Sequence, residues 1–326
     1  MKRLGTTRTA APAQLDPSGP AAGEIASLWW WMLAGATVVT ILVVTLLVIP
    51  ILRRRGQAPS DGDDHEDVAP ALTRRWIVGL GIVMPAVVLI GVLVFSVATM
   101  RTVSRAAPAG SVVIDVVAYQ YWWEAEYPGE GVTVANELHI PAGEPVELRM
   151  TSADVIHSFW VPDLQGKIDM LPDGITTLVI EADEPGIYLG ACAEFCGVQH
   201  AMMNFLVVAQ PPEEFARWLD EQRAPAAAPT DEESRRGAAV FEDAGCAACH
   251  TVEGVSDAEG ATTPGPDLTH VGSRRTLAAD TISNTPEEMA RWLRDPDAVK
   301  PGTTMPVPEL TDAELSDLVA YLESLR

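Results

Sequence analysis

The chain has 326 residues and a formal net charge of −23 at pH 7. The charge is unevenly distributed, because residues 1–110 carry 10 Lys and Arg against 7 Asp and Glu, whereas residues 111–326 carry 12 against 38. A region this acidic repels nucleic acid and favours a basic protein partner, although the same charges could serve only to keep the protein soluble.

Two apolar runs without a charged side chain occur in the N-terminal third, at 29–52 and 76–100. Each has about 24 residues and would be roughly 36 Å long as a helix, which is enough to cross a bilayer. Arginines cluster at both ends of the intervening segment 53–75, so the positive-inside rule assigns that segment to the cytoplasm. We therefore expect a membrane hairpin at 29–100, with the tail 1–28 and the C-terminus on the external side. A cleaved signal peptide is the alternative for the first run, but that run is too long and lacks a cleavage pattern.

Residues 111–222 have the pattern of a separate β domain. Up to residue 208, short alternating or apolar runs are broken by Pro and Gly, as is typical of a β-sandwich or small barrel. The runs are S-V-V-I-D-V-V-A, G-V-T-V-A-N-E-L-H-I, E-P-V-E-L-R-M, T-T-L-V-I-E-A, G-I-Y-L-G and N-F-L-V-V-A. A helix at about 212–222 ends this domain, and the Pro/Ala-rich stretch 223–229 predicts a short, semi-rigid linker.

After the linker, residues 230–326 predict a small, mostly helical domain. Three Thr-x-x-Glu patterns, which begin at Thr230, Thr285 and Thr311, fit the capping box that satisfies free N–H groups at a helix N-terminus. The last pattern opens an amphipathic helix near the C-terminus. A domain of this size buries limited apolar surface, so a bound cofactor at its centre would help to hold it together.

The four cysteines form two pairs, Cys192/Cys196 in the β domain and Cys246/Cys249 in the helical domain. Outside the cytoplasm such pairs are usually structural disulfides, but the neighbouring residues indicate other chemistry. Cys246-Ala-Ala-Cys249-His250 is the C-x-x-C-H pattern of covalent c-type haem attachment, in which His250 ligates the iron. A thioredoxin-like redox pair is the alternative, but it requires a βαβ context that this region lacks.

A second axial ligand of the haem iron should come from further along the chain. Met305 lies in a loop framed by Pro and Gly, and such a loop can present a thioether without a helix in the way. A thioether opposite His raises the reduction potential of the haem, which suits an electron carrier near the oxidising end of a chain. His270 is the competing ligand, but its segment fits better with packing over the proximal His or with a hydrogen bond.

The densest group of potential metal ligands is C-A-E-F-C-G-V-Q-H-A-M-M, in which Cys192, Cys196, His200 and Met203 lie on one short loop. Thiolate, imidazole and thioether are soft donors, which favour copper over calcium, magnesium or manganese. A second imidazole must then come from elsewhere in the chain. The expected donor is His157, at a strand end in S-A-D-V-I-H-S-F-W-V-P.

Other interpretations of this loop are weaker. His139 could replace His157, but it occupies an alternating strand position followed by a turn, which indicates a structural role. A mononuclear blue-copper site uses one thiolate, whereas two thiolates can bridge two coppers, each with one His and one weak ligand. Zinc could also take two Cys and two His, but a structural zinc site has no use for Met203.

Residues 230–326 resemble a class I cytochrome c domain over nearly their whole length. The resemblance rests on the C-x-x-C-H pattern, the Gly-Pro-Asp-Leu stretch at 265–268, the Met305 loop and the terminal helix. It implies haem c attached to Cys246 and Cys249, with His250 and Met305 as axial ligands of the iron.

From the first apolar run through Ala209, the chain resembles subunit II of haem–copper cytochrome c oxidases. The matching features are the hairpin, Q-Y-W-W-E at 120–124, Y-P at 127–128, H-S-F-W-V-P at 157–162, G-K-I-D at 166–169 and the loop at 192–203. The resemblance implies a cupredoxin fold that holds the binuclear copper centre CuA. It assigns as ligands the bridging thiolates of Cys192 and Cys196, the imidazoles of His157 and His200, the thioether of Met203 and the backbone carbonyl of Glu194.

The same resemblance implies further details of the copper domain. The side chain of Glu194 would face a partner subunit and could contribute to a magnesium or manganese site there. Tyr121 stands where many relatives have a Trp associated with electron input, so we assign no role to Tyr121, Trp122 or Trp123. The fusion of the two domains resembles the caa-type oxidases, whose subunit II carries its own cytochrome c.

These resemblances imply the electron-input subunit of a proton-translocating respiratory oxidase in a bacterial inner membrane. Cytochrome c or a cytochrome bc complex would reduce haem c, which would reduce CuA, which would reduce the haems of subunit I. Oxygen reduction would occur in that separate chain, because the hairpin lacks intramembrane histidines and proton-relay groups. Further partners would be subunit III and membrane lipid. The alternatives are the electron-input subunit of a CuA-type nitric oxide reductase, and a copper-binding assembly protein, which would not need a haem.

Overall fold

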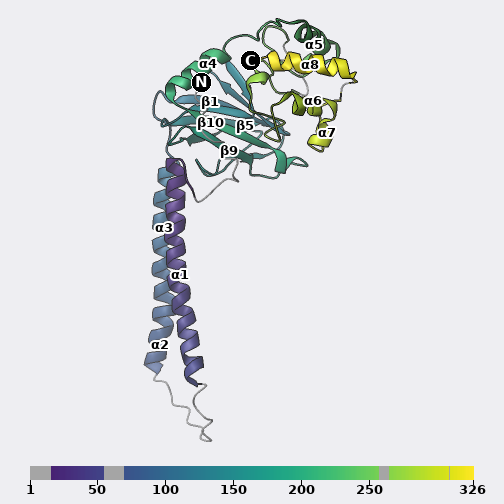
Figure 1. Ribbon diagram of the computed structural model, residues 1–326. Helices are drawn as coiled ribbons and strands as arrows, with labels where there is room; N and C mark the ends of the chain where they lie inside the picture. The colour runs from purple at the N-terminus through teal and green to yellow at the C-terminus, as the bar shows by residue number, and fades with distance from the viewer. Residues whose placement is uncertain (1–15, 55–69, 257–263, 308) are drawn as a thin grey trace. The chain divides into compact units, whose positions relative to one another are not determined.

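The computed structural model describes residues 16–54, 70–256, 264–307 and 309–326. They form two units, Gly23–Arg105 and a second unit made of 106–326 together with the N-terminal residues up to Ala22. Figure 1 shows two long helices in the first unit, and a β-sandwich and a helical domain in the second. The predicted fold class is therefore confirmed.

Two helical stretches make up the apolar unit. The first is α1 (Pro20–Arg54), and the second is continuous from α2 (Pro70–Val78) through a π-helical turn (Gly79–Val83) to α3 (Met84–Val103). Each is long and apolar enough to cross a membrane. Their large apolar side chains are exposed, which is favourable in lipid and costly in water. The first helix begins at Pro20 rather than at residue 29, because Pro is favoured in a first helical turn and nothing in the following residues breaks a helix.

The β domain is a sandwich of two five-stranded sheets. The first sheet has, in spatial order, β3 (Val132–Ala135), β2 (Trp122–Tyr127), β1 (Val112–Tyr119), β5 (Val146–Ser152) and β8 (Thr176–Ile180). The second has β4 (Glu137–Pro141), β10 (Asn204–Gln210), β9 (Gly186–Cys192), β6 (His157–Trp160) and β7 (Ile168–Met170). Strand β1 pairs parallel with β5, and β10 pairs parallel with β4, whereas the other pairs are antiparallel.

One predicted run, residues 131–140, forms two strands rather than one. The break is at Asn136, whose φ of 62° lies in the left-handed region that Asn tolerates better than most residues. Strand β3 therefore belongs to the first sheet and β4 to the second, so this residue is where the chain crosses between the layers. The side chain of Asn136 also accepts a hydrogen bond from Trp123 N at 3.0 Å.

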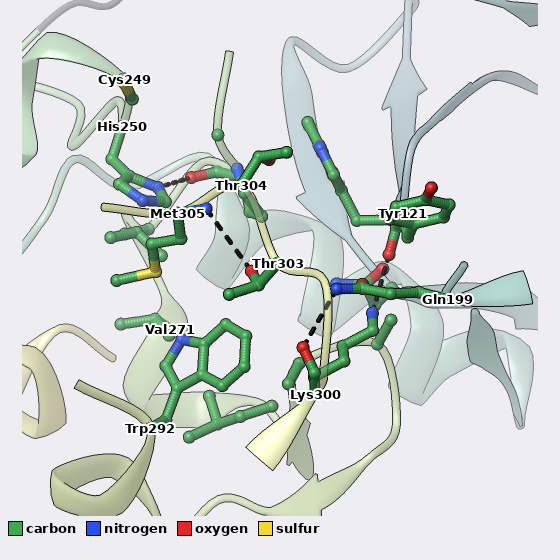
Figure 2. A pocket seen from close by; sticks show the side chains of 18 of the residues that line it. Tyr121, Gln199, Cys249, His250, Val271, Trp292, Lys300, Thr303, Thr304 and Met305 are labelled. Atoms are coloured by element: carbon green, nitrogen blue, oxygen red, sulfur yellow. Dashed lines mark hydrogen bonds between the residues drawn. The ribbon is translucent and has the colours of Figure 1, made fainter. Parts of the chain in front are cut away.

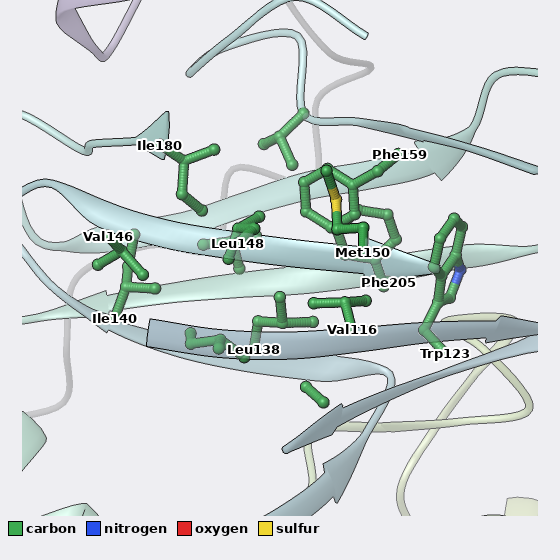
Figure 3. Close-up of a cluster of buried hydrophobic side chains, with 14 of the residues drawn as sticks. Val116, Trp123, Leu138, Ile140, Val146, Leu148, Met150, Phe159, Ile180 and Phe205 are labelled. Atoms are coloured by element: carbon green, nitrogen blue, oxygen red, sulfur yellow. The ribbon is translucent and has the colours of Figure 1, made fainter. Parts of the chain in front are cut away.

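The core of the sandwich lies directly beneath the cysteine loop. Figure 3 shows side chains from both sheets meeting between the layers, among them Trp123, Phe159 and Phe205. The ring centroids of Phe205 lie 4.9 Å from those of Trp123 and 4.6 Å from those of Phe159. Burial of each such side chain stabilises the fold by roughly 1.5–3 kcal/mol. The same buried cluster contains the sulfur atoms of Cys192, Cys196 and Met203, so the loop is anchored in the rigid part of the domain.

Two further segments pack on the sandwich. Helix α4 (Pro212–Gln222) buries Phe215 and Leu219. At the N-terminal side, Ser18 N donates to the carbonyl of Asp163 at 2.7 Å, and Ser18 O accepts from Asp183 N at 2.8 Å. Ser18, just before the first helix, is thereby hydrogen-bonded to the sandwich.

The C-terminal domain is built from short helices. In chain order they are α5 (Glu232–Asp243), a 3-10 turn (Cys246–Ala248), a second 3-10 turn (Val271–Ser273), α6 (Pro286–Arg294), α7 (Pro296–Val299) and α8 (Asp312–Ser324), with a small hairpin of β11 (Thr276–Leu277) and β12 (Ile282–Ser283). Helices α5 and α8 cross closely at Gly237, where a Cβ would collide with the backbone of Asp317. Phe241 and Tyr321 then pack edge to face, with ring centroids 5.7 Å apart.

Two of the three predicted capping boxes coincide with helix starts. Thr311 and Glu314 form the full reciprocal box at α8, and Thr285 caps α6 by accepting from Glu288 N. The prediction for Thr230 is wrong, because Asp231 is the N-cap of α5 and accepts a hydrogen bond from Ser234 N. A carboxylate caps as well as a hydroxyl and adds a favourable charge at the positive end of the helix dipole.

Candidate functional site

The cysteine loop joins two neighbouring strands of the second sheet. Cys192 is the last residue of β9, and Met203 directly precedes β10. The Cys192 N–H donates to Met203 O at 3.0 Å, and Ala193 N donates to Ser158 O at 2.9 Å, so both ends of the loop are fixed to strands. Gly197 has a φ of 131°, which is a conformation that few other residues adopt.

All four cysteines belong to the part of the chain that the structure describes, and none of them forms a disulfide. The Sγ atoms of Cys192 and Cys196 lie 3.8 Å apart, and together with the nearest ring nitrogen of His157 they fall within 4.8 Å of one another. The three residues are buried. Buried soft donors at this separation can bind metal ions together. A structural disulfide, which is the usual interpretation of such a cysteine pair, would not need a histidine beside the two sulfur atoms.

The remaining predicted ligands divide evenly between the two thiols. Cys192 Sγ lies 3.8 Å from His157 Nδ1 and 3.2 Å from the carbonyl oxygen of Glu194. Cys196 Sγ lies 3.8 Å from His200 Nδ1 and 3.8 Å from Met203 Sδ. Each thiol thus has one imidazole and one weaker donor beside it, which is the donor set that a pair of bridged coppers requires.

Hydrogen bonds prepare this group for metal binding. The hydrogen bond with Cys196 lowers the pKa of Cys192 to about 3, against the opposing effect of burial, and a thiolate is the form that binds metal. Burial opposes protonation of His157, but its hydrogen bonds with Cys192 and Asp154 outweigh that effect and raise its pKa. A metal ion at Nδ1 would take the place of that proton.

Asp154 is a residue of this site that the sequence did not identify. Its Oδ1 lies 2.8 Å from His157 Nε2 and accepts from Val155 N at 2.6 Å, while its Oδ2 accepts from Gln120 N at 2.7 Å. A carboxylate on the far nitrogen fixes the tautomer and orientation of a metal-binding His. The only signal in the sequence was an Asp three positions before His157, and nothing distinguished it from other loop acids.

Glu194 faces in two directions. Its backbone carbonyl contacts Cys192 Sγ, whereas its side chain is partly exposed and lies 3.5 Å from Lys167 Nζ. The same ammonium lies 3.7 Å from Asp169. The backbone carbonyl of Glu194 can therefore act as a donor beside Cys192 while the Glu194 carboxylate makes other contacts.

His139 has a structural position, as the sequence predicted. It stacks on Trp218, with ring centroids 4.0 Å apart, and its Nδ1 lies 2.9 Å from Gln210 Oε1. Burial lowers its pKa from 6.5 to about 4, so the ring is neutral. These contacts attach α4 to the sandwich.

The second candidate site is a pocket next to the C-x-x-C-H sequence. Cys246–Ala248 forms the 3-10 turn after α5, and Cys249 and His250 line the pocket. His250 Nδ1 donates to the carbonyl of Pro266 at 2.7 Å, which leaves Nε2 with its lone pair free for a metal. Burial lowers the pKa of His250 and favours this neutral ring. Gly265 is required beside it, because a Cβ there would lie 2.6 Å from the ring.

Met305 lines the same pocket as His250, as Figure 2 shows. His270 is instead 7% exposed, with Nε2 at 3.2 Å from the carbonyl of Gln222 and at 3.0 Å from that of Ala224. His270 therefore makes hydrogen bonds outside the pocket lining, whereas Met305 is part of that lining.

The pocket also has a wall that the sequence did not predict. Gln120, Tyr121, Trp122, Asn136 and Gln199 of the sandwich line it together with the helical domain. In Figure 2, Tyr121 and Gln199 lie across the pocket from His250 and Met305. Contacts between residues this far apart in the sequence leave no local pattern.

Two segments of the chain, each of which contains one of the two candidate sites, match known protein families. Residues 130–210 match the family described as cytochrome c oxidase subunit II, periplasmic domain, and residues 234–326 match the cytochrome c family. The chain is 32% identical over 266 residues to cytochrome c oxidase subunit 2 of Bacillus sp. (strain PS3), covering 76% of this chain and 74% of that protein. The chain belongs to the cytochrome c oxidase subunit 2 family.

Other subunit 2 proteins match a similar length. The one from Alkalihalophilus pseudofirmus is 39% identical over 217 residues, which cover 66% of this chain and 62% of that protein. The chain thus spans a little under two thirds of that relative. A solved structure, the periplasmic domain of subunit II of cytochrome oxidase of Bradyrhizobium japonicum, is 26% identical, with a TM-score of 0.35, and covers 36% of this chain and 97% of that one.

The match to the subunit II family implies copper, and the match to the cytochrome c family implies haem. The residues present fit both groups. The first site offers two thiols, two imidazoles, a thioether and a carbonyl at close range. The second offers Cys249, a neutral His250 and Met305 around one pocket, with Cys246 in the turn that precedes Cys249.

Proposed function

We propose that this subunit 2 chain is the electron-input subunit of a haem–copper cytochrome c oxidase, in which electrons reach haem c first, pass to CuA and continue to the haems of subunit I. Oxygen would be reduced to water in subunit I. The observation that carries the proposal is the even division of donors around Cys192 and Cys196 in a unit that also contains a C-x-x-C-H pocket.

At the first site the chain would hold two coppers between the Cys192 and Cys196 thiolates. His157, His200, Met203 and the Glu194 carbonyl, which all lie within 3.8 Å of one of the two sulfurs, would complete the coordination of the two coppers. A bridged pair shares one electron over both ions and therefore changes its bond lengths little on electron transfer. The buried donors and Asp154 keep the ligands in place between oxidation states.

At the second site Cys246 and Cys249 would bind the haem covalently, and His250 and Met305 would ligate the iron. The hydrogen bond to Pro266 keeps the His250 ring neutral and oriented. A Met ligand raises the potential of the haem relative to a second His, which suits an electron carrier near the oxidising end of a chain. The physiological donor to this haem would be a basic cytochrome c or a cytochrome bc complex, steered by the acidic charge of residues 111–326.

The orientation in the membrane would place both termini and both cofactor domains on the external side. Arginines at 53–55 and 74–75 favour a cytoplasmic location for the segment between the helices. Subunits I and III and membrane lipid would surround the hairpin, and the exposed Glu194 carboxylate could contribute to a magnesium or manganese site shared with subunit I.

A reciprocal pair of variants tests the proposal in the purified complex. Cys196→Ser should abolish the near-infrared absorption of mixed-valence copper and leave the haem c spectrum unchanged, because one bridging thiolate is lost. Cys246→Ser is the matched control, since it should alter haem attachment and leave the copper band in place. An unchanged copper band in Cys196→Ser would contradict the copper assignment. Consumption of oxygen rather than nitric oxide by the wild-type complex should distinguish an oxidase from a nitric oxide reductase.

A further inference from the structure

The contacts between the two cofactor domains are made by buried polar groups. Lys300 is 3% exposed, and its Nζ donates to the carbonyl of Tyr121 at 2.9 Å. Gln199, which is 2% exposed, donates from Nε2 to the carbonyl of Lys300 at 3.1 Å. The two hydrogen bonds run in opposite directions across the same boundary, and both residues line the haem pocket.

Glu137 makes a second buried contact across this boundary. It is 4% exposed at the start of β4, and its Oε1 accepts from Arg275 N at 2.6 Å and from Thr276 N at 3.1 Å. Burial raises the pKa of Glu137, and the two backbone hydrogen bonds and the charges of Arg274 and Arg275 oppose that rise. Thr276 and Arg274 also line the haem pocket, so this contact is at the pocket rim as well.

Burial of these groups requires one particular arrangement of the domains. A domain joined by a short linker is expected to move relative to its neighbour unless the interface prevents it. Buried charged and polar groups are costly without partners, so Glu137 and Lys300 favour the arrangement in which their backbone partners are in place. Glu137 and Lys300 therefore select one relative geometry of the two domains. Selecting one geometry is the best-attested role of buried polar groups.

The arrangement connects the haem pocket with the copper ligands. Gln120 lines the pocket, and its Nε2 donates to the backbone carbonyl of Cys196 at 2.6 Å. The hydroxyl of Tyr121, on the same wall, accepts from Val198 N of the cysteine loop at 3.2 Å. One short segment is thus in contact with both sites.

We infer that Glu137 and Lys300 are positioning residues that lock the haem domain onto the copper domain, so that electrons pass between the two sites within one fixed intramolecular geometry across the Gln120–Trp122 wall. In this step the haem iron loses one electron and the copper pair gains it, and no bond is formed or broken. The inference rests on the proposed function of the two sites.

The test measures the distance between the two centres in the full-length protein. Low-spin ferric haem and mixed-valence copper are both paramagnetic, so pulsed EPR should give one narrow distance distribution for the wild type. Glu137→Ala leaves the Arg275 and Thr276 N–H groups unpaired in the docked state, and undocking lets them bind water. This variant should show a broad distribution and an intramolecular electron-transfer rate about tenfold lower after flash reduction, equivalent to about 1.4 kcal/mol at 25 °C.

Two control variants distinguish the loss of the contact between the two domains from a general loss of folding. Glu137→Gln keeps an acceptor oxygen and should retain the narrow distribution and at least half of the wild-type rate. Glu144→Ala removes the same charge from an exposed turn of the sandwich and should change neither quantity. Lys300→Met tests the other contact, keeps the side-chain length and should broaden the distribution as Glu137→Ala does. The haem and near-infrared copper bands should remain as in the wild type in the Glu137 and Glu144 variants, because neither residue lines the pocket.

The results distinguish two kinds of failure. A wild-type protein that lacks either the haem or the copper signal would overturn the proposed function, and the dock with it. The other failure is one in which both signals are present, and both Glu137→Ala and Lys300→Met keep a narrow distance distribution and the wild-type electron-transfer rate. That result would refute the role of Glu137 and Lys300 in holding the two domains together and would leave the proposed function unaffected.

Discussion

Asp154 offers the sharpest test of how the chain prepares its copper ligands. The side chain of His157 is fully buried, and once Nδ1 binds a metal its Nε2–H donates to the Asp154 carboxylate, at 2.8 Å. In Asp154→Ala that donor has no acceptor, and the N–H groups of Gln120 and Val155 lose theirs as well. We therefore expect weaker copper binding and a less ordered His157, with no change at the haem.

The magnitude follows from the lost hydrogen bond. A hydrogen bond to a charged group contributes roughly 1.5–3 kcal/mol, and about 1.4 kcal/mol corresponds to a tenfold change in affinity. Asp154→Ala should thus weaken copper binding by about 10–100-fold, which is the usual effect of removing the partner of a metal-binding His. Asp154→Asn keeps an acceptor but loses the charge, so about half of the free energy should remain and the loss should be about 3–10-fold.

Competition with a chelator, followed through the near-infrared copper band of the full-length protein, measures this affinity. Asp173→Ala is the matched control, because Asp173 is exposed and the variant removes the same charge. The reasoning would be refuted if Asp154→Ala bound copper within twofold of the wild type, or if Asp173→Ala weakened binding as strongly.

Two other predictions concern Met305 and His139. Met305→Ala should lower the haem reduction potential and remove the sulfur-to-iron absorption, whereas His270→Gln should leave both unchanged; persistence of that absorption in Met305→Ala would assign the ligand to another residue. Burial lowers the pKa of His139 to about 4, so between about pH 4 and 6.5 the unfolded chain binds more protons than the folded chain. The free energy of unfolding therefore falls as the pH falls through that window. His139→Gln should reduce this slope by up to about 1.4 kcal/mol per pH unit, measured by urea unfolding at pH 5 and 7, and an unchanged slope would contradict the assignment.

Much of the fold was predictable because its signals are local. The two apolar runs, the alternating strands, the helix at Pro212–Gln222 and the capping box at Thr311 all depend on residues close together in the sequence. The cap at Asp231 was missed because Thr230 and Asp231 are adjacent and equally capable, and only the backbone conformation selects between them. The crossing at Asn136 was missed because an alternating pattern continues through it on both sides.

The candidate ligands were also predictable, with one qualification. Cys192, Cys196, His200 and Met203 lie within one loop, so their spacing alone brings them together. The choice of His157 over His139 rested on the strand pattern and the family resemblance, and the contacts of the two rings agree with it. Asp154 carried no signal, because its role depends on where β6 starts relative to its own loop.

The sequence by itself determined the chemistry of this subunit 2 chain: two thiols with soft neighbours on one loop, a C-x-x-C-H pattern with a downstream Met, and two apolar spans. These properties are local, since donor type and spacing do not depend on distant parts of the chain. Only the tertiary structure decided how the donors divide between Cys192 and Cys196, and that residues of the sandwich line the pocket beside His250 while Glu137 and Lys300 join the two domains. The contacts of Glu137 and Lys300 join residues more than a hundred positions apart, and burial in the folded state is what gives them their energy.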